Sequence, residues 1–143
     1  IGKRLIKSPK IYMLDSGLAT FLMGIHTKET LLGSPYMPHL FEAYIISDIY
    51  KRFHHCGIVP SMYYLRTQDG MEIDLIIEWG GGLHLFEIKS SATITPSHAS
   101  SLLRGKRDMK ELVQNSTVIS NSNESFHVIN NIYNYTIQDI LSL

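Results

Sequence analysis

The clearest pattern in the chain is a run of alternating apolar and polar side chains over Met71–Trp79, followed by a second extended run over Leu83–Lys89. A period of two is typical of a half-buried β-strand. Gly80, Gly81 and Gly82 separate the two runs. Because Gly-Gly readily adopts positive φ at both centres of a two-residue turn, the sequence predicts an antiparallel hairpin.

This turn also fixes which residues face each other. The predicted register pairs Trp79 with Gly82, Asp74 with Glu87, and Glu72 with Lys89. Glu87 and Lys89 lie on one face because they are two residues apart. Like charges opposite each other destabilise a sheet, so the pair of Asp74 and Glu87 predicts a compensating divalent cation. A three-residue loop would instead shift the pairing by one and move Glu87 to the other face.

A helical stripe of apolar residues runs through Pro38–Cys56. On a wheel of about 100° per residue, the residues divide into two sides. The apolar side holds Phe41, Ile45, Ile46, Ile49, Tyr50 and Phe53, and the polar side holds Ser47, Lys51, His54 and His55. Glu42 falls near the middle of the apolar side, where a carboxylate needs a partner. It is either a buried glutamate satisfied by a hydroxyl, a backbone amide or a lysine, or a member of one site with Asp74, Glu87 and Lys89.

Capping and turn residues divide the rest of the chain. We expect a short helix over Gly17–Met23 capped by Asp15 or Ser16, a strand over Ser61–Thr67, a helix from Pro96 to about Val113, short strands at Val118–Ile119 and Phe126–Ile129, and a last helical turn capped by Thr136. The main order is therefore helix, three strands, helix, strand, which predicts an α/β fold.

Composition narrows the class of protein. The 143 residues suffice for one domain with a core, and 44% hydrophobic and 18% charged residues are typical of a soluble globular chain. No apolar run approaches the roughly 20 residues of a membrane span, and no signal peptide opens the sequence. Cys56 is the single cysteine, which excludes an intrachain disulfide and fits a reducing cytoplasm. The first residue, Ile1, indicates a piece of a longer protein.

Charge is balanced, with 13 basic and 13 acidic residues. This balance argues against a surface dedicated to nucleic acid. Two local basic clusters remain: Lys3, Arg4, Lys7 and Lys10, and then Arg104, Lys106, Arg107 and Lys110. Each cluster either contacts phosphates or forms a solvated face.

At this point the residues resemble a known family. An acid on the first helix of an αβββαβ order, an aspartate in the second strand and Glu-x-Lys in the third are similar to the PD-(D/E)xK nuclease superfamily. Four blocks, SPKIYMLDSGLATFLMG, LFEAYIISDIYKR, YYLRTQDGMEIDLIIE and LFEIKSS, more narrowly resemble the domain of unknown function at the C-terminus of many AAA-type ATPases. The resemblance extends from Lys10 to about Met109, and Ile73 replaces the proline of the motif.

The resemblance implies a restriction-endonuclease-like core in which helices flank a mixed central sheet. Residues 1–33 would be a lead-in segment, the tail of a winged-helix part, and residues 34–143 the nuclease-like domain. The partners implied are an ATPase domain of the same parent chain and DNA or RNA. No G-x-x-x-x-G-K-[ST] occurs in these residues, so we expect no ATP site of that kind here.

Carried over residue by residue, the resemblance implies a metal-dependent site. Asp74 and Glu87 would bind Mg²⁺ or Mn²⁺ together with the carbonyl of Ile88. Lys89 would position the attacking water, and Glu42 would hold a water of the ion or a second ion. Such ions bind through one or two carboxylates and activate water for hydrolysis.

Several basic residues are candidate contacts to nucleic acid. Arg66 would reach a phosphate or form a salt bridge with Glu72. Arg104, Lys106 and Arg107 would contact phosphates from the later helix.

Two functions follow as expectations. The first is a Mg²⁺-dependent phosphodiesterase acting on nucleic acid, which the complete set of Glu42, Asp74, Glu87 and Lys89 favours. The second is a non-catalytic docking, regulatory or DNA-binding module that keeps the nuclease fold, which the zero net charge favours.

Overall fold

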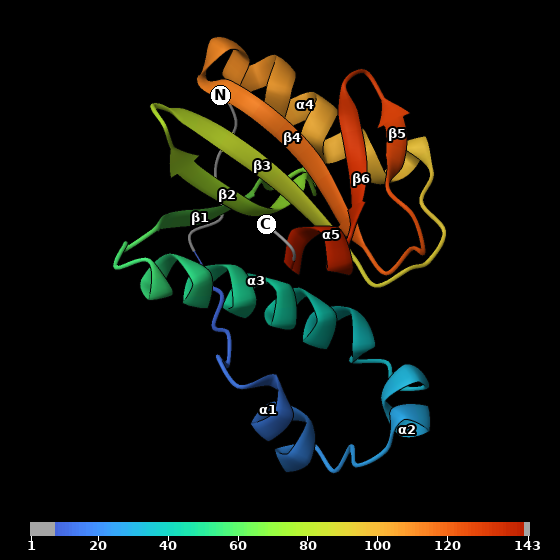
Figure 1. The fold of residues 1–143 in the computed structure, drawn as a ribbon. Helices are drawn as coiled ribbons and strands as arrows, with labels where there is room; N and C mark the ends of the chain where they lie inside the picture. Colours follow the sequence, from blue (N-terminus) through green and yellow to red (C-terminus); the bar gives the residue numbers. More distant parts are fainter. Residues whose placement is uncertain (1–7, 142–143) are drawn as a thin grey trace. The chain divides into compact units, whose positions relative to one another are not determined.

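The computed structural model of the chain describes residues 8–141 (Figure 1). The expected basic cluster at Lys3, Arg4 and Lys7 lies outside these residues. The described chain forms two compact units: a helical unit, Pro9–Val59, and a sheet unit that comprises Ser8 and the residues from Pro60 onward. The predicted division into a lead-in of residues 1–33 and a domain of residues 34–143 stays a prediction.

The helical unit contains α1 (Ser16–Leu22), α2 (Lys28–Leu32) and α3 (Met37–His55). Asp15 caps α1, since the Leu18 N–H donates to Asp15 Oδ1 at 2.9 Å. The sequence did not predict α2. Its capping box uses two threonines, Thr27 and Thr30, rather than the more recognisable threonine and glutamate.

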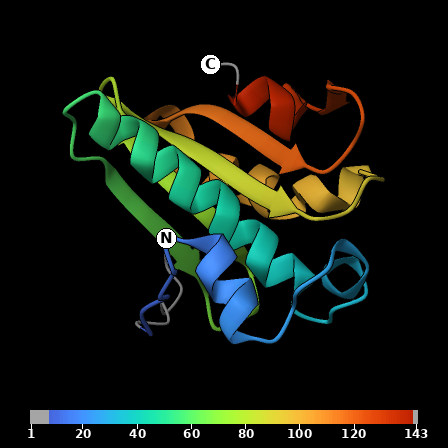
Figure 2. The same ribbon diagram turned by 60° about the horizontal axis from the view of Figure 1, so that its bottom comes forward.

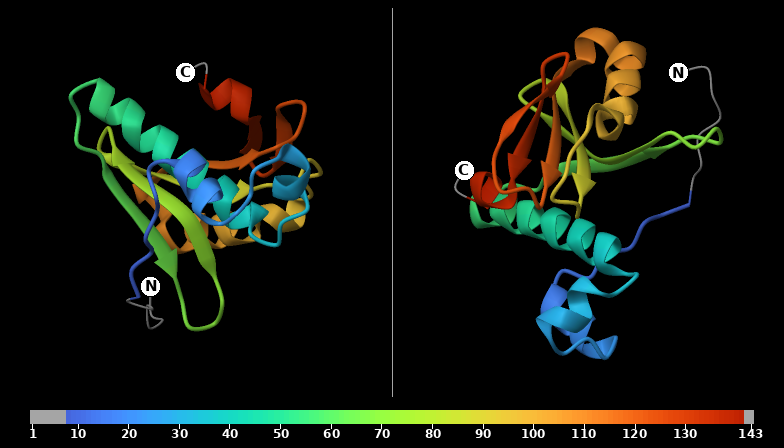
Figure 3. Two further views of the ribbon diagram at one scale, coloured as in Figure 1. Left: turned by 90° about the horizontal axis from the view of Figure 1, so that it is seen from below. Right: turned by 90° about the vertical axis from the view of Figure 1, so that its right-hand side faces the viewer.

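The long helix α3 begins with Pro38 in its first turn, where the missing N–H costs nothing. Phe41, Ile45 and Ile49 are buried on it, as the apolar stripe predicts. Ser47 was expected on the polar side but is buried. Its hydroxyl donates to the Met13 carbonyl at 3.1 Å, so this polar group is satisfied and ties the preceding segment to α3. Helix α1 lies beside α3 (Figures 2 and 3).

The sheet unit is built on one mixed sheet with the strand order β1-β2-β3-β4-β6-β5. The strands are β1 (Ser61–Arg66), β2 (Glu72–Trp79), β3 (Gly82–Lys89), β4 (Val113–Ser120), β5 (Phe126–Ile129) and β6 (Ile132–Thr136). Strands β1, β2 and β3 are antiparallel, β3–β4 and β4–β6 are parallel, and β5–β6 is antiparallel. The chain is therefore an α/β protein with a mixed central sheet, as predicted.

Strands β4 and β6 differ from the strands that the sequence predicts. The strand predicted at Val118–Ile119 extends over the whole of β4, because polar residues such as Gln114 and Asn115 continue it without an apolar period. Strand β6 was missed. Asn130 and Asn131 have φ of 47° and 60°, and they form the turn between β5 and β6. Asparagine tolerates positive φ, so an Asn-Asn pair between two β-rich runs was a usable hairpin signal.

The helix predicted from Pro96 to about Val113 is divided into three parts. A 3₁₀ turn, Pro96–Ala99, precedes α4 (Ser100–Met109), and a second 3₁₀ turn, Lys110–Leu112, follows it. Helix α4 packs on β2, β3 and β4, with Leu102 and Leu85 fully buried between the layers (Figure 1). A Cβ on Gly105 would lie 2.6 Å from Ile73 Cδ1, so the missing side chain permits this close approach.

The short helix α5 (Ile137–Leu141) packs on β4 and β6. Its start is fixed by Thr136, whose Oγ1 accepts from the Asp139 N–H at 3.1 Å. The predicted threonine cap is therefore confirmed.

The glycine hairpin between β2 and β3 forms with the predicted turn. Trp79 pairs with Gly82, and Gly80 and Gly81 have φ of 60° and 82°. This turn sets the pairing register of β2 with β3 from Trp79–Gly82 to Leu75–Phe86.

Replacing both turn glycines with alanine, Gly80→Ala/Gly81→Ala, is expected to destabilise the protein by about 1–2 kcal/mol per residue. The cause is the clash of a Cβ at positive φ. The free energy of unfolding in urea measures this change. Gly33→Ala is the matched control, since Gly33 has a φ of −84° that alanine adopts freely. An unchanged stability in the double variant would contradict the turn.

Candidate functional site

The strand pairing changes next to Asp74. The paired residues of β2 and β3 run from Trp79–Gly82 to Leu75–Phe86. The pairing therefore ends one step before the predicted pair of Asp74 and Glu87. On the other side of β2, the pairing with β1 shifts between Ile76 and Ile73. Such a bulge redirects side chains. Asp74 Oδ2 accepts a hydrogen bond from the Ile88 N–H at 2.8 Å, so its carboxylate is fixed against β3.

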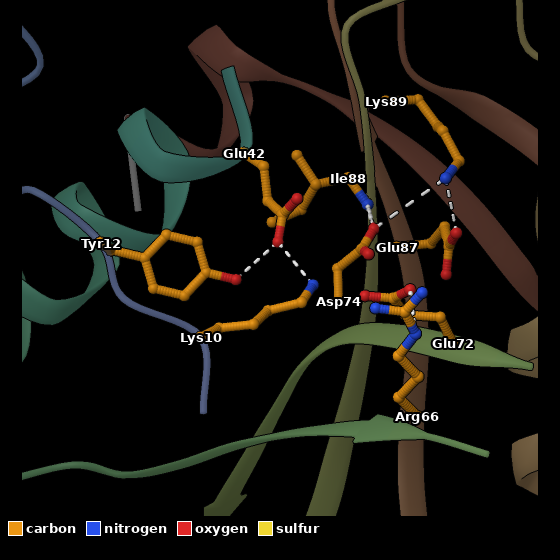
Figure 4. Close-up of polar contacts among 9 residues, drawn as sticks. All are labelled: Lys10, Tyr12, Glu42, Arg66, Glu72, Asp74, Glu87, Ile88 and Lys89. Atoms are coloured by element: carbon orange, nitrogen blue, oxygen red, sulfur yellow. Dashed lines mark hydrogen bonds and ion pairs between the residues drawn. The ribbon is translucent and has the colours of Figure 1, made fainter. Parts of the chain in front are cut away.

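Asp74, Glu87 and Lys89 form a compact cluster at the end of β3 (Figure 4). Lys89 Nζ lies 2.6 Å from Glu87 Oε1 and 4.0 Å from Asp74 Oδ2. Asp74 and Glu87 are buried, with 8% and 6% of their surfaces exposed. The structure thus brings these three predicted residues together, with one ammonium group shared between two carboxylates.

Glu87 is the residue of the cluster whose charged form is least favourable. Burial and then the negative charge of Asp74 raise its pKa from 4.5 to about 7, although the hydrogen bond and charge of Lys89 oppose the rise. Its second oxygen, Oε2, is buried without a hydrogen-bond partner among the described residues. A cation at this oxygen would stabilise the charged form of Glu87 and would offset both the free-energy cost of its burial and its repulsion from Asp74.

These donors suit a hard divalent ion. The structure shows no group of three or more His, Cys, Asp and Glu side chains suited to metal binding within residues 8–141. Asp74 and Glu87 supply two carboxylates, however, and Mg²⁺ commonly binds through one or two carboxylates and retains water. The orphaned Oε2 of Glu87 is the observation that favours an ion at this position.

Glu42 has partners of its own within the helical unit. Its Oε1 accepts from the Tyr12 hydroxyl at 2.5 Å and forms an ion pair with Lys10 Nζ at 3.0 Å (Figure 4). Burial and the contact with Glu42 raise the pKa of Tyr12. A lysine and a hydroxyl were among the partners that the sequence predicted for a buried glutamate. The predicted approach of Glu42 to Asp74 involves both units and stays a prediction.

Tyr12 was not among the predicted site residues. Lys10 and Tyr12 are two residues apart in an extended segment, so both side chains can reach the same carboxylate. That spacing, upstream of an acid inside an apolar stripe, was the available signal.

Three of the four candidate nucleic-acid residues form ion pairs with nearby carboxylates, and the fourth lines a hollow. Arg66 on β1 lies opposite Glu72 on β2, and its Nε is 3.6 Å from Glu72 Oε2 (Figure 4). Of the two predicted roles for Arg66, this ion pair is the salt bridge with Glu72. Arg104 contacts Asp69 at 2.6 Å, and Arg107 contacts its neighbour Asp108 at 3.2 Å. Lys106 lines a hollow on the sheet.

The raised pKa of Glu87 predicts a pH dependence. The native state holds this proton more tightly than the unfolded chain, so the contribution of Glu87 to stability is largest below about pH 4.5 and falls as the pH rises toward 7. The slope from one group is at most about 1.4 kcal/mol per pH unit.

Urea unfolding across this pH range, in chelator, measures the effect. Glu87→Gln is expected to flatten the slope, while Glu78→Gln, an exposed glutamate on β2, is expected to leave it unchanged. A variant Glu87→Gln with the wild-type slope would contradict the raised pKa.

The sheet and the buried cluster define an α/β domain with a carboxylate–lysine site at the end of a central strand. The chain belongs to the family described as Domain of unknown function (DUF4143), whose model matches residues 38–140. It is 35% identical over 111 residues to the uncharacterised proteins Rv2008c of Mycobacterium tuberculosis and Mb2031c of Mycobacterium bovis. The match covers 77% of this chain but 24% of each relative, so the chain spans about a quarter of their length.

No solved structure matches the chain significantly. Within the described residues, no helix is both long and apolar enough to cross a membrane.

Proposed function

We propose that this domain is a PD-(D/E)xK-like phosphodiesterase that cleaves nucleic acid and forms the C-terminal part of an AAA-type ATPase. The observation that carries the proposal is Lys89 Nζ, held 2.6 Å from Glu87 and 4.0 Å from Asp74 in a buried cluster. Two carboxylates and one ammonium group in this arrangement match the chemistry of phosphodiester hydrolysis. The αβββαβ part of the element order supports the same fold assignment.

Each residue would contribute a distinct step. Lys89 would orient the attacking water and neutralise charge that develops on the phosphate oxygens. Glu87 would hold the Lys89 ammonium group in place through their 2.6 Å contact. Asp74 is fixed by the Ile88 N–H, so its position would not change during the reaction.

Asp74, Glu87 and the Ile88 carbonyl would hold Mg²⁺ or Mn²⁺. When bound, such an ion supplies Lewis-acid stabilisation of the phosphate and of the leaving oxygen.

Glu42 would have a supporting role. Lys10 and Tyr12 both contact Oε1, so this oxygen is committed to the helical unit. Its second oxygen, Oε2, would receive a water or a second ion. Lys10 and Tyr12 would therefore act as positioning residues for Glu42.

The test is a cleavage assay with the full-length protein on single- and double-stranded DNA and RNA in Mg²⁺ or Mn²⁺. Cleavage that disappears with chelator and with Asp74→Ala would support the proposal. Cleavage that Asp74→Ala leaves unchanged would show that another site, or a contaminant, is responsible.

One observation favours the second candidate, a non-catalytic docking or regulatory module. The chain has zero net charge, which gives little general attraction to phosphates. Full-length protein that folds normally but neither binds divalent ions nor cleaves any of the substrates would favour this function.

A further inference from the structure

A hollow of about 500 Å³ lies over β3, β4 and β6 within the sheet unit. Four of its lining residues carry rings, His84, Phe86, Tyr133 and Tyr135, and Asn115 and Lys106 also line it. His84 and Phe86 alternate with Glu87 along β3, so they point to the opposite face of the strand. The hollow is therefore separate from the carboxylate–lysine cluster, and its volume is in the range of ligand sites.

Two tyrosine rings give the hollow an accessible aromatic surface. Tyr133 and Tyr135 are two residues apart on β6, with ring centroids 6.5 Å apart and an interplanar angle of 31°. Their surfaces are 45% and 38% exposed. Ring faces that are exposed in this way are surfaces on which planar rings of a ligand stack.

Two buried polar atoms in the lining lack hydrogen bonds. His84 Nε2 and Ser116 Oγ are both buried and have no partner among the described residues. Native proteins leave few such atoms, so these two make part of the lining of the hollow polar. The lining of the hollow therefore combines aromatic rings with polar side chains.

The charge of the lining favours an anionic ligand. Lys106 contributes the positive charge, and no aspartate or glutamate is among the described residues that line the hollow. Amide side chains such as Asn115 add donors and acceptors suited to the edge of a base.

We propose that this hollow binds single-stranded nucleic acid. Successive bases stack on Tyr133 and Tyr135, base edges reach Asn115, and Lys106 contacts a phosphate. Aromatic residues on the face of a β-sheet, combined with a cation, are a general solution for binding unpaired bases. Two neighbouring rings suit two linked bases better than one free nucleotide. The site goes beyond the proposed hydrolysis, because binding here requires neither the metal ion nor Lys89.

The test uses the full-length protein and a fluorescein-labelled oligo(dT), with chelator present so that cleavage cannot contribute. Tyr135→Ala is expected to weaken binding by roughly tenfold or more, the effect of one lost stacking contact. Tyr135→Phe keeps the ring and is expected to bind like the wild type. Tyr63→Ala, which removes a 54% exposed tyrosine from β1, is the matched control and is expected to change nothing.

Lys106→Gln provides a second measurement that does not alter the aromatic surface. It is expected to reduce the slope of log K against log salt concentration by about 0.7, the value for one phosphate contact to a single strand. Lys51→Gln, at an exposed lysine of α3, is expected to leave the slope unchanged.

Three results would overturn the site: binding that Tyr135→Ala leaves unchanged, equal weakening by Tyr63→Ala, or binding of free mononucleotides without binding of oligo(dT). Because all measurements are made in chelator, failure here would leave the proposed hydrolysis untouched. Loss of hydrolysis in Asp74→Ala would equally leave binding at the hollow intact.

Discussion

Lys89→Ala is expected to lower the rate of nucleic-acid cleavage by about a hundredfold or more while leaving divalent-ion binding largely intact. Removal of one preorganised group that stabilises developing charge typically has an effect of this size. Lys89 contacts both carboxylates, but an ammonium group cannot ligate a metal ion. Asp74 and Glu87 would therefore still bind the ion in this variant. Without Lys89 the two carboxylates repel each other more strongly, which would favour ion binding further.

The measurement pairs a cleavage assay of the full-length protein with calorimetric titration of Mg²⁺ or Mn²⁺. Lys28→Ala, at an exposed lysine of α2, is the control for loss of a positive charge. Asp74→Ala is expected to remove both cleavage and ion binding. Equal residual cleavage by wild type and Lys89→Ala would assign the cleavage to a contaminant and favour the non-catalytic module.

Divalent ions are expected to raise the stability of the native protein. Asp74 and Glu87 are buried near each other, and Glu87 Oε2 lacks a partner among the described residues, so an ion would relieve both repulsion and desolvation. An ion that binds only the native state stabilises it by about 2.7 kcal/mol at a hundredfold excess over Kd. Thermal unfolding in chelator and in Mg²⁺, Mn²⁺ or Ca²⁺ measures the gain.

Asp74→Asn is expected to abolish this gain. Asparagine is nearly isosteric and its oxygen can still accept from the Ile88 N–H, so the substitution removes the charge while keeping the contact that fixes β2 against β3. Glu78→Gln, an exposed glutamate on the same strand, is the matched control and should retain the full gain. A wild-type protein whose unfolding temperature is indifferent to millimolar divalent ions would contradict a metal site.

The β2–β3 hairpin shows how far local pattern predicts a site. The alternation over Met71–Trp79 and the Gly80-Gly81 turn are local properties, and together they predict the register up to Leu75–Phe86. The bulge beside Asp74 depends on the pairing with β1, which no local pattern encodes. The hydrogen bond between Asp74 and the Ile88 N–H was therefore beyond sequence analysis.

Glu42 illustrates a different limit. The apolar stripe of α3 correctly indicated that this carboxylate needs a partner. Its partners, Lys10 and Tyr12, are about 30 residues earlier in the chain, and both donate to the same oxygen. A helical wheel describes one helix and cannot identify a side chain that another segment contributes.

By itself the sequence determined the α/β class, the central hairpin, the glycine turn and the acidic and basic residues that carry the candidate chemistry. These features follow from periodicity and from the φ preferences of glycine, which act over a few residues. Only the tertiary structure decided the order of β4, β5 and β6, the partners of Glu42 and the burial that raises the pKa of Glu87. Each of these depends on contacts between distant segments, whose free energies appear only when the chain is packed.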